Sequence, residues 1–584
     1  MTNSRRDIFK FAGGAVAGAL FTPAPWRLIT DTALWSENWP GIPRPARGEI
    51  RAKFTNCALC PAGCAVRARC VGEQPVSLAG VHGGLCPFGL TGHHLPYHPA
   101  RLKQGPIEEA KAAVRKRAPD GIAILDLNPG RTVSWTYRRA MASLQGLYLA
   151  PESQPVAYDL SAAKTVLSIG APLLDGWGTP ANVNAARQNF RLIQAEAVES
   201  RTAVLADEWI PLAPGTERAF AQEILGALQG ERTSVVAREL TADGSSFVLG
   251  DAPEIPEINR LLGAYGKIIV APSEAPVPEP WKKSAAAITR LADVPDHSIR
   301  VLLIDESNAA SYIPWHFIEP KLTGDNPLVV TFAATRGGYA RHAQYALPIA
   351  VYPELTDDIA PAVDSIHPTF RISVPLVAPV VTPPAGLANP ADFVGALAGV
   401  PASNALRERA DAIHQSAEGA IVTYADGKET PVKDLTADAF WKSLNQGAKW
   451  VGHALACQPA VGRPCLGGLS TPSSPAETPE ASADLPLIAI REPHNPALVS
   501  PLMTKLYQES GLRLAPNRVA LNPDDARAAH VPNGARAVLQ TRIGRCSVEV
   551  TVDPAVPPGA VQVGGSPGIQ DVCGPAARVK VVPA

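Results

Sequence analysis

Short apolar runs, each ending in a polar turn, recur between about residues 120 and 400. They fall at 163–174, 202–212, 266–273, 299–307 and 326–334. Between some of them, 215–230 and 256–266 place apolar residues at helical spacing. Continuous apolar runs that alternate with amphipathic helices predict buried parallel strands in doubly wound α/β layers. In such layers, functional groups are expected where the strands end.

The remaining pattern predicts several further segments, as a chain of 584 residues requires. After α/β domains over 107–400, residues 401–484 are expected to form a helical segment and a Pro/Ser-rich linker. Residues 485–584 contain short strands separated by Pro, Gly and Asn, which predicts a β-barrel. Ahead of the α/β region, 51–106 form a small cysteine-containing domain and 31–50 an arm rich in Trp and Pro.

The first 30 residues are typical of an export signal. Arg5 and Arg6 precede Phe9 and Lys10, and a small apolar run follows over 11–21. This is the twin-arginine pattern, which addresses folded, often cofactor-loaded proteins to the periplasm. No A-x-A cleavage signal follows, so a retained segment that tethers the chain to the membrane stays open. No other stretch approaches 18 apolar residues, and membrane contact is therefore expected through partners or this segment.

Composition excludes one class of function. The formal net charge is −1, whereas a nucleic-acid binder needs a basic face to neutralise phosphates. With 46% hydrophobic residues the chain can fill several folded cores. The candidate functional residues are therefore the cysteines rather than a basic face.

Five of the nine cysteines lie between residues 57 and 86. Cys57, Cys60, Cys64 and Cys86 follow the spacing C-x2-C-x3-C-x21-C, which can bring four thiolates around one centre. Four thiolates suit a [4Fe–4S] cluster or a structural zinc ion. Zinc sites usually offer two C-x2-C pairs, and a disulfide framework is the third reading in an oxidising compartment. Cys70 is interpreted as a buried, inert thiol.

The cysteine spacing near the start of an exported chain resembles the molybdopterin oxidoreductase superfamily. Four further segments resemble it in the family's order: 168–180, 206–219, 345–354 and 520–544. The resemblance covers most of the chain. It implies that Cys57, Cys60, Cys64 and Cys86 ligate a [4Fe–4S] cluster in a domain of the Mo/W bis-MGD type. It also implies that the terminal barrel is of the molybdopterin-dinucleotide-binding type.

Several residues depart from the family's pattern. After the fourth cysteine the family usually has x-Lys-Gly, with the lysine between cluster and pterin; here Pro87 and Phe88 follow Cys86. The segment that carries the family's molybdenum ligand is shortened and has no cysteine, and Glu217 stands where the family has aspartate. These departures predict a member without molybdenum and leave retention of a pterin dinucleotide open. No catalytic residue is assigned.

In these departures the chain resembles the molybdopterin-like subunits of menaquinone reductase and alternative complex III. That resemblance implies a periplasmic subunit of a membrane-bound respiratory quinone oxidoreductase, with electron-transfer and scaffold roles. Its partners would be an integral-membrane quinone-module subunit, a ferredoxin-like multi-cluster subunit and a multihaem cytochrome c. The alternatives are a catalytic periplasmic Mo/W enzyme acting on formate or a small oxyanion, and a scaffold with no cofactor.

Other residues allow chemistry without requiring it. An oxidising periplasm permits the disulfides Cys457–Cys465 and Cys546–Cys573, while export of a folded chain permits free thiols. The histidines of GHHLPYHP (92–99) could face a haem partner or could be satisfied surface groups. Asp305 and Glu306 end a predicted strand, where they could approach a dinucleotide or cap the next helix.

Overall fold

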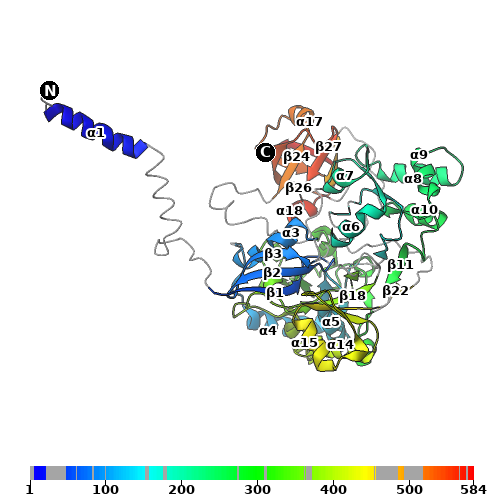
Figure 1. Ribbon diagram of the computed structural model, residues 1–584. Coiled ribbons are helices and arrows are strands. Elements are labelled where there is room, and N and C mark those ends of the chain that lie inside the picture. The colour runs from blue at the N-terminus through cyan, green and yellow to red at the C-terminus, as the bar shows by residue number, and fades with distance from the viewer. Residues whose placement is uncertain are drawn as a thin grey trace. The chain divides into compact units, whose positions relative to one another are not determined.

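The computed structural model describes the chain in a set of ranges separated by gaps (Figure 1). These are 5–21, 48–60, 62–81, 84–98, 100–151, 157–171, 173–174, 180–272, 275–307, 312–360, 362–363, 371–452, 454–455, 484–491, 517–564, 566–573 and 577–584. One compact unit comprises residues 1–51 with 70–74, and the second comprises the rest. The first unit contains helix α1 (Arg5–Phe21). Among the described helices, none has the length and apolar character needed to cross a bilayer.

A six-stranded sheet forms the centre of the predicted α/β region. Its order is β12-β5-β4-β13-β14-β15, and every pairing is parallel. The strands are β4 (Ile122–Asp126), β5 (Leu147–Leu149), β12 (Ile288–Thr289), β13 (Val301–Asp305), β14 (Leu328–Ala333) and β15 (Tyr345–Pro348). Helices α4 (Ile107–Arg117), α5 (Thr132–Ser143) and α13 (Pro390–Ala398) contribute to the core on one face. The order reverses between β4 and β13, which makes their C-terminal ends the switch point.

A second parallel sheet has the order β10-β7-β8-β9. Its strands are β7 (Thr165–Ile169), β8 (Arg191–Glu196), β9 (Glu208–Pro211) and β10 (Ser246–Gly250). Helices α8 (Glu217–Leu228), α9 (Val235–Ala242) and α10 (Ile255–Leu261) pack their apolar side chains on one face. The helices predicted over 215–230 and 256–266 are thus confirmed.

Two predicted strands are wrong in part. The run 202–212 begins as helix α7 (Arg201–Leu205), because the Ser200 hydroxyl accepts a hydrogen bond from the Ala203 amide at 3.2 Å and caps the helix. Only β9 is extended. The run 266–273 does contain β11 (Ile269–Pro272), but β11 pairs antiparallel with β6 (Ala157–Tyr158) and β22 (Ala454–Leu455) in a sheet of its own.

A third large sheet occupies part of the segment predicted to be helix and linker. Its order is β16-β18-β21-β19-β20, with β17 beside β18. The strands are β16 (Asp357–Asp358), β17 (Ala362–Val363), β18 (Ile372–Val377), β19 (Ala420–Thr423), β20 (Glu429–Pro431) and β21 (Ala448–Val451). Helices α14 (Ala405–Gln415) and α15 (Ala437–Asn445) pack against one face of it. Most of the predicted linker lies outside the described residues.

The chain ends in a closed barrel, as predicted (Figure 1, orange to red). Its order is β23-β27-β24-β26-β25-β28. The strands are β23 (Leu487–Arg491), β24 (Arg518–Leu521), β25 (Arg536–Gln540), β26 (Arg545–Val552), β27 (Ala560–Val563) and β28 (Arg578–Pro583). Cys546 and Cys573 both lie in its core, and the disulfide between them that the sequence allowed is not formed. Cys457 and Cys465 lie outside the described residues.

Buried charges join the first sheet to the third. Asp126 and Asp305 face each other in register at the ends of β4 and β13. Between them lies Arg131, only 1% exposed. Its Nη2 donates to Asp305 Oδ2 at 2.8 Å and lies 3.5 Å from Asp126 Oδ1, while its Nη1 donates to Asp357 Oδ2 at 2.8 Å. Because Asp357 belongs to β16, this guanidinium connects the two sheets.

Replacing Arg131 with methionine is expected to destabilise this core strongly. Removing one partner of a buried ion pair leaves uncompensated charge and costs about 3–5 kcal/mol. Denaturation by urea, followed by tryptophan fluorescence, measures the loss. The exposed pair of Arg290 and Asp293 supplies the control, because Arg290→Met should cost less than about 1 kcal/mol. Equal small losses in the two variants would contradict the role given to Arg131.

Candidate cysteine site

The first three cysteines of the motif occupy one tight loop. Cys57 follows β1 (Ile50–Asn56) and Cys64 precedes β2 (Ala65–Val71). The Cys57 amide donates to the Cys64 carbonyl at 2.8 Å and closes the loop. Gly63 has a φ of +57°, and a Cβ there would lie 3.3 Å from Ile359 Cδ1 and 3.4 Å from Pro375 Cγ. The loop therefore lies directly on residues of the third sheet's region, with glycine at the closest point.

Hydrogen bonds fix the loop to the same sheet. Asn56 Nδ2 donates to the Leu376 carbonyl at 2.7 Å, and Thr55 Oγ1 donates to the Ala378 carbonyl at 2.7 Å. The hydroxyl of Tyr424 donates to Asn56 Oδ1 at 2.6 Å. Since Asn56 is fully buried, both ends of its amide are satisfied by residues more than 300 positions away in the chain.

The fourth cysteine enters from a separate turn. Cys86 stands at the N-cap of α3 (Pro87–Thr91), and its carbonyl accepts a hydrogen bond from the Leu90 amide at 3.0 Å. Pro87 at the first helical position fixes the start of this helix. The charge of Cys86 acts on Cys57, Cys60 and Cys64, and the role of the four cysteines as cluster ligands stays a prediction.

Burial and mutual repulsion dominate the electrostatics of Cys57, Cys60 and Cys64. Burial raises the pKa of Cys57 and of Cys64 well above the ordinary value, and the neighbouring cysteines raise both further. Burial and the charge of Cys86 raise the pKa of Cys60 to about 12. The thiols are therefore close enough to oppose one another's ionisation, and a positively charged centre between them would relieve that repulsion. Cys70 is also buried, but it belongs to the other compact unit.

A buried tyrosine lies beside these thiols. Tyr352 begins the short helix η8 (Tyr352–Glu354) and is 1% exposed. Ionised Cys57, Cys64 and Cys86 would each raise its pKa, after burial, which raises it most. Among the described residues its hydroxyl has no hydrogen-bond partner. Buried hydroxyls are normally satisfied, so this one fits a site that receives a further acceptor.

Two contacts hold Tyr352 in place. A Cβ on Gly92 would lie 2.6 Å from Tyr352 Cε1, so only glycine allows the turn after α3 to approach the ring. Two residues further on, Glu354 forms a two-pronged buried ion pair with Arg101, whose Nη1 donates to Oε1 at 2.7 Å. The turn after α3 therefore holds the Tyr352 ring, and the Glu354–Arg101 ion pair holds the short helix η8 that carries it.

The structure does not form a site for a single metal ion here. Over the described parts of the chain, no group of three or more His, Cys, Asp or Glu is arranged to hold a metal ion. A tetrahedral zinc site needs sulfurs about 3.8 Å apart, because each Zn–S bond is about 2.3 Å. A four-iron cube is larger than one ion and holds its four ligand sulfurs farther apart. A cluster on the four cysteines stays a prediction.

The predicted histidines form a short 3-10 helix, η2 (Gly92–Tyr97), with His98 at its end. The rings of His93 and His94 lie with their centroids 4.0 Å apart and are tilted by 36°. Burial lowers the pKa of each of the three histidines. Tyr97 between them is 60% exposed. Their contact with a haem partner stays a prediction.

The segments 168–180 and 206–219, which resemble dinucleotide-binding loops, lie where β7 and β9 end. A Cβ on Gly170, whose φ is +61°, would lie 3.4 Å from the side chain of Glu217 at the start of α8. Burial raises the pKa of Glu217. On β8, Glu196 Oε1 accepts from the Ser200 amide at 2.9 Å and Oε2 from Gln194 at 3.0 Å. Much of 172–182 lies outside the described residues or their side chains, so the full loop is not defined.

Glu306 is the most unusual carboxyl at the central switch point. Burial raises its pKa to about 7, although Thr331 Oγ1 donates to its Oε1 at 2.6 Å and the Ala340 amide donates at 3.1 Å. A Cβ on Gly338 would lie only 2.1 Å from Oε2, so glycine lets the backbone lie against this carboxyl. The neighbouring Asp305 caps the turn instead, because its Oδ1 accepts from the Ser307 amide at 2.8 Å.

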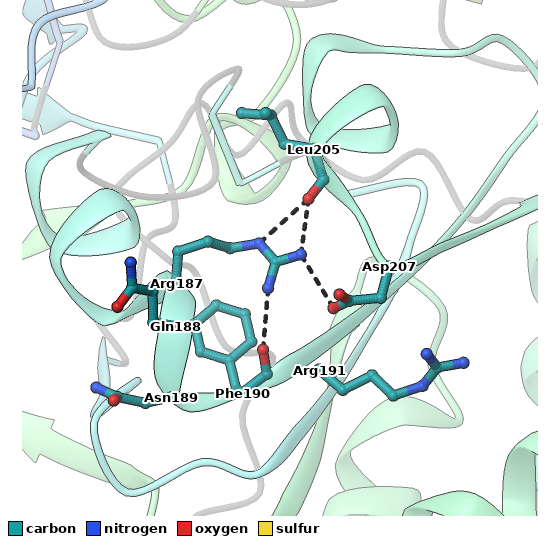
Figure 2. A pocket seen from close by; sticks show the side chains of 7 residues that line it. All are labelled: Arg187, Gln188, Asn189, Phe190, Arg191, Leu205 and Asp207. Atoms are coloured by element: carbon teal, nitrogen blue, oxygen red, sulfur yellow. Dashed lines mark hydrogen bonds and ion pairs between the residues drawn. The ribbon is translucent and has the colours of Figure 1, made fainter.

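An open hollow of about 680 Å³ lies beside the second sheet (Figure 2). Its lining residues are Arg187, Gln188, Asn189, Phe190, Arg191, Leu205 and Asp207. Arg187 donates to the Leu205 carbonyl at 2.7 Å, to the Phe190 carbonyl at 3.0 Å and to Asp207 Oδ2 at 3.0 Å. These hydrogen bonds of Arg187 all go to other residues of the chain, which indicates a structural role for Arg187.

Three buried residues of the site were missed by sequence reasoning. They are Arg131, Tyr352 and Lys449. Arg131 follows a strand that ends in aspartate, and this could have suggested a switch-point group. Tyr352 lies inside the segment 345–354 that resembles the family, without any sign of its contact with the cysteines. Lys449 carries no signal beyond its position in the apolar run of 448–451.

Comparison with known proteins supports the expected resemblance. Residues 503–573 match the family model described as the molydopterin dinucleotide binding domain. The menaquinone reductase, molybdopterin-binding-like subunit of Nitratidesulfovibrio vulgaris is 26% identical over 507 residues, which covers 66% of this chain and 71% of the relative. Acetylene hydratase from Pelobacter acetylenicus shares the fold, with a TM-score of 0.61 at 14% identity, over 91% of this chain and 100% of that chain.

These findings confirm the resemblance to the molybdopterin oxidoreductases and the mixed α/β architecture with a terminal barrel. The matched domain overlaps the barrel strands from β24 to β27. The iron–sulfur nature of the N-terminal domain stays a prediction.

Glu306 should make stability depend on pH. Its folded pKa of about 7 lies above the usual value of about 4.3, so its stabilising contribution is complete below the usual value and is lost as pH rises through about 7. Glu306→Gln removes this loss. The free energy of unfolding of the variant relative to the native chain should therefore rise between about pH 5 and pH 8. Glu319→Gln changes an exposed carboxyl and serves as the control. If the free energy of unfolding of Glu306→Gln relative to the native chain changes as little with pH as that of the control, the assignment is refuted.

Proposed function

We propose that this chain is a periplasmic, molybdopterin-oxidoreductase-like subunit of a membrane-bound quinone oxidoreductase of the menaquinone reductase type. In this role it carries one [4Fe–4S] cluster on Cys57, Cys60, Cys64 and Cys86 and provides a scaffold for its electron-transfer partners. The observation that carries the proposal is that the charges of these four cysteines act on one another, in a chain similar to a menaquinone reductase subunit.

The residues around the cysteines fit such a cluster. The positive iron centre of a cluster would offset the mutual repulsion of the thiolates. Its sulfurs would also accept a hydrogen bond from the Tyr352 hydroxyl. When bound, it accepts and donates single electrons. The protein's part is to hold the four sulfurs on the loop of Cys57, Cys60 and Cys64 and at the N-cap of α3. Phe88, in place of the family's lysine, breaks the polar path toward a pterin.

Export and assembly complete the proposal. The twin-arginine pattern over 5–10 supports delivery to the periplasm with the cluster already inserted. The partners proposed are a polytopic quinone-module subunit, a ferredoxin-like subunit with several clusters and a multihaem cytochrome c. They rest on the similarity to a subunit of menaquinone reductase.

A second candidate is a catalytic Mo/W enzyme that acts on formate or a small oxyanion. The match of 503–573 to a dinucleotide-binding domain favours retention of a pterin. Against molybdenum ligation, the segment between α5 and β7 contains no cysteine. Metal content distinguishes the two candidates.

Metal analysis of the chain purified anaerobically with its export signal tests the proposal. We expect about four iron atoms per chain, the content of a single four-iron cluster, with molybdenum and tungsten far below one per chain. Stoichiometric molybdenum or tungsten would support the catalytic alternative. Iron near zero would favour a scaffold without cofactor.

Substitution of the cysteines tests the ligand assignment. Cys57→Ser should remove most of the iron and the low-temperature EPR signal of the reduced cluster, because one of four thiolate ligands is lost. Cys70→Ser changes a buried cysteine of the same region that lies outside the proposed ligand set, and it should retain both iron and signal. The assignment fails if Cys70→Ser loses the cluster and Cys57→Ser keeps it.

A further inference from the structure

A fully buried lysine lies at the centre of the third sheet. Lys449 belongs to β21, which pairs with β18 on one side and β19 on the other. Its side chain has no exposed surface. In register, it lies opposite Pro375 and Val422. Burying an ammonium group is costly unless negative charge lies nearby, so its surroundings need an explanation.

The two faces of this sheet differ. Trp450 packs in the core with helices α14 and α15, and so do Val374 and Ile421, which lie opposite it. Side chains alternate along a strand, and directly opposed residues share a face. Lys449 and Pro375 therefore point to the face opposite these helices.

The cysteine loop lies on that face. The ring of Pro375 approaches Gly63, the residue before Cys64, with 3.4 Å between Pro375 Cγ and a Cβ built on the glycine. The Asn56 side chain is bonded to Leu376, next to Pro375 on the same strand. Lys449 thus lies beneath the loop that carries three of the four cysteines.

The charge of Lys449 acts on one of them, Cys64. Burial raises the pKa of Cys64 and so do Cys60 and Cys86, whereas the Lys449 ammonium acts in the opposite direction and lowers it. An opposite charge near an ionisable group favours its charged form, and a thiolate is the form that ligates iron.

We propose that Lys449 is the counter-cation of the four-cysteine centre, supplied by β21 in place of a lysine after Cys86. The inference rests on the proposed cluster and adds the residue that sets its charge balance. A thiolate-bound cluster is anionic, and its negative charge increases by one electron on reduction. A buried cation stabilises the reduced form more than the oxidised form and raises the reduction potential.

Redox titration followed by EPR tests this role on the full-length chain purified anaerobically. Lys449→Met should shift the midpoint potential of the cluster to a more negative value, while Lys449→Arg, which keeps the charge, should restore most of it. Lys442→Met removes an exposed lysine from helix α15 of the same region and should leave the potential unchanged.

Iron content and the EPR signal are measured first in every variant. A native chain without cluster would overturn the proposed function, whereas an intact cluster whose potential is the same in Lys449→Met and in the native chain would overturn only the role of Lys449. If the methionine variant does not fold, Lys449→Gln and Lys449→Arg provide the comparison. Equal potentials in these two would overturn the inference, and a lower potential in Lys449→Gln supports it.

Discussion

The buried guanidinium of Arg131 is the interaction on which the arrangement of the α/β core depends. It binds the carboxylates that end β4 and β13, and it also binds Asp357 of β16. The adjacent Asp358 accepts from Arg409 Nη1 at 2.6 Å and from the Thr132 amide at 2.7 Å. A short strand of two residues is thereby held by two buried arginines. Since β16 pairs with β18, the same charges position the sheet on which the cysteine loop lies.

This dependence has an electrostatic consequence. Doubly wound sheets usually bind ligands at the switch point, and here the chain's own groups fill that place. Two guanidiniums meet four carboxylates: Arg131 and Arg409 meet Asp126, Asp305, Asp357 and Asp358. The chain's own arginines and carboxylates pair with one another at this sheet. The four-cysteine centre, by contrast, combines thiols that repel one another with a nearby cation from β21. The two regions of the molecule thus differ in what they can accept.

Much of the fold could be predicted from local sequence, and the reasons for failure are physical. The strands β7, β13 and β14 are continuous apolar runs buried on both faces, so their pattern is unambiguous. The run 202–212 misled because Ser200 caps a helix there, and a cap is a hydrogen bond between neighbours that outweighs strand propensity. The third sheet escaped prediction because β19, β20 and β21 have only 4, 3 and 4 residues and are stabilised by pairing across the chain.

The candidate site, like the fold, could be predicted from the sequence only in part. The four cysteines could be singled out from their spacing and from the resemblance, and their role as ligands stays a prediction. Tyr352 and Lys449 could not be, since their role depends on packing against residues far away in sequence. X-ray anomalous scattering at the iron edge, from crystals of the full chain, tests the central claim most directly. The account predicts one compact iron peak enclosed by the Sγ atoms of Cys57, Cys60, Cys64 and Cys86. A peak at the zinc edge instead, or iron bound elsewhere with these four thiols unligated, would contradict it.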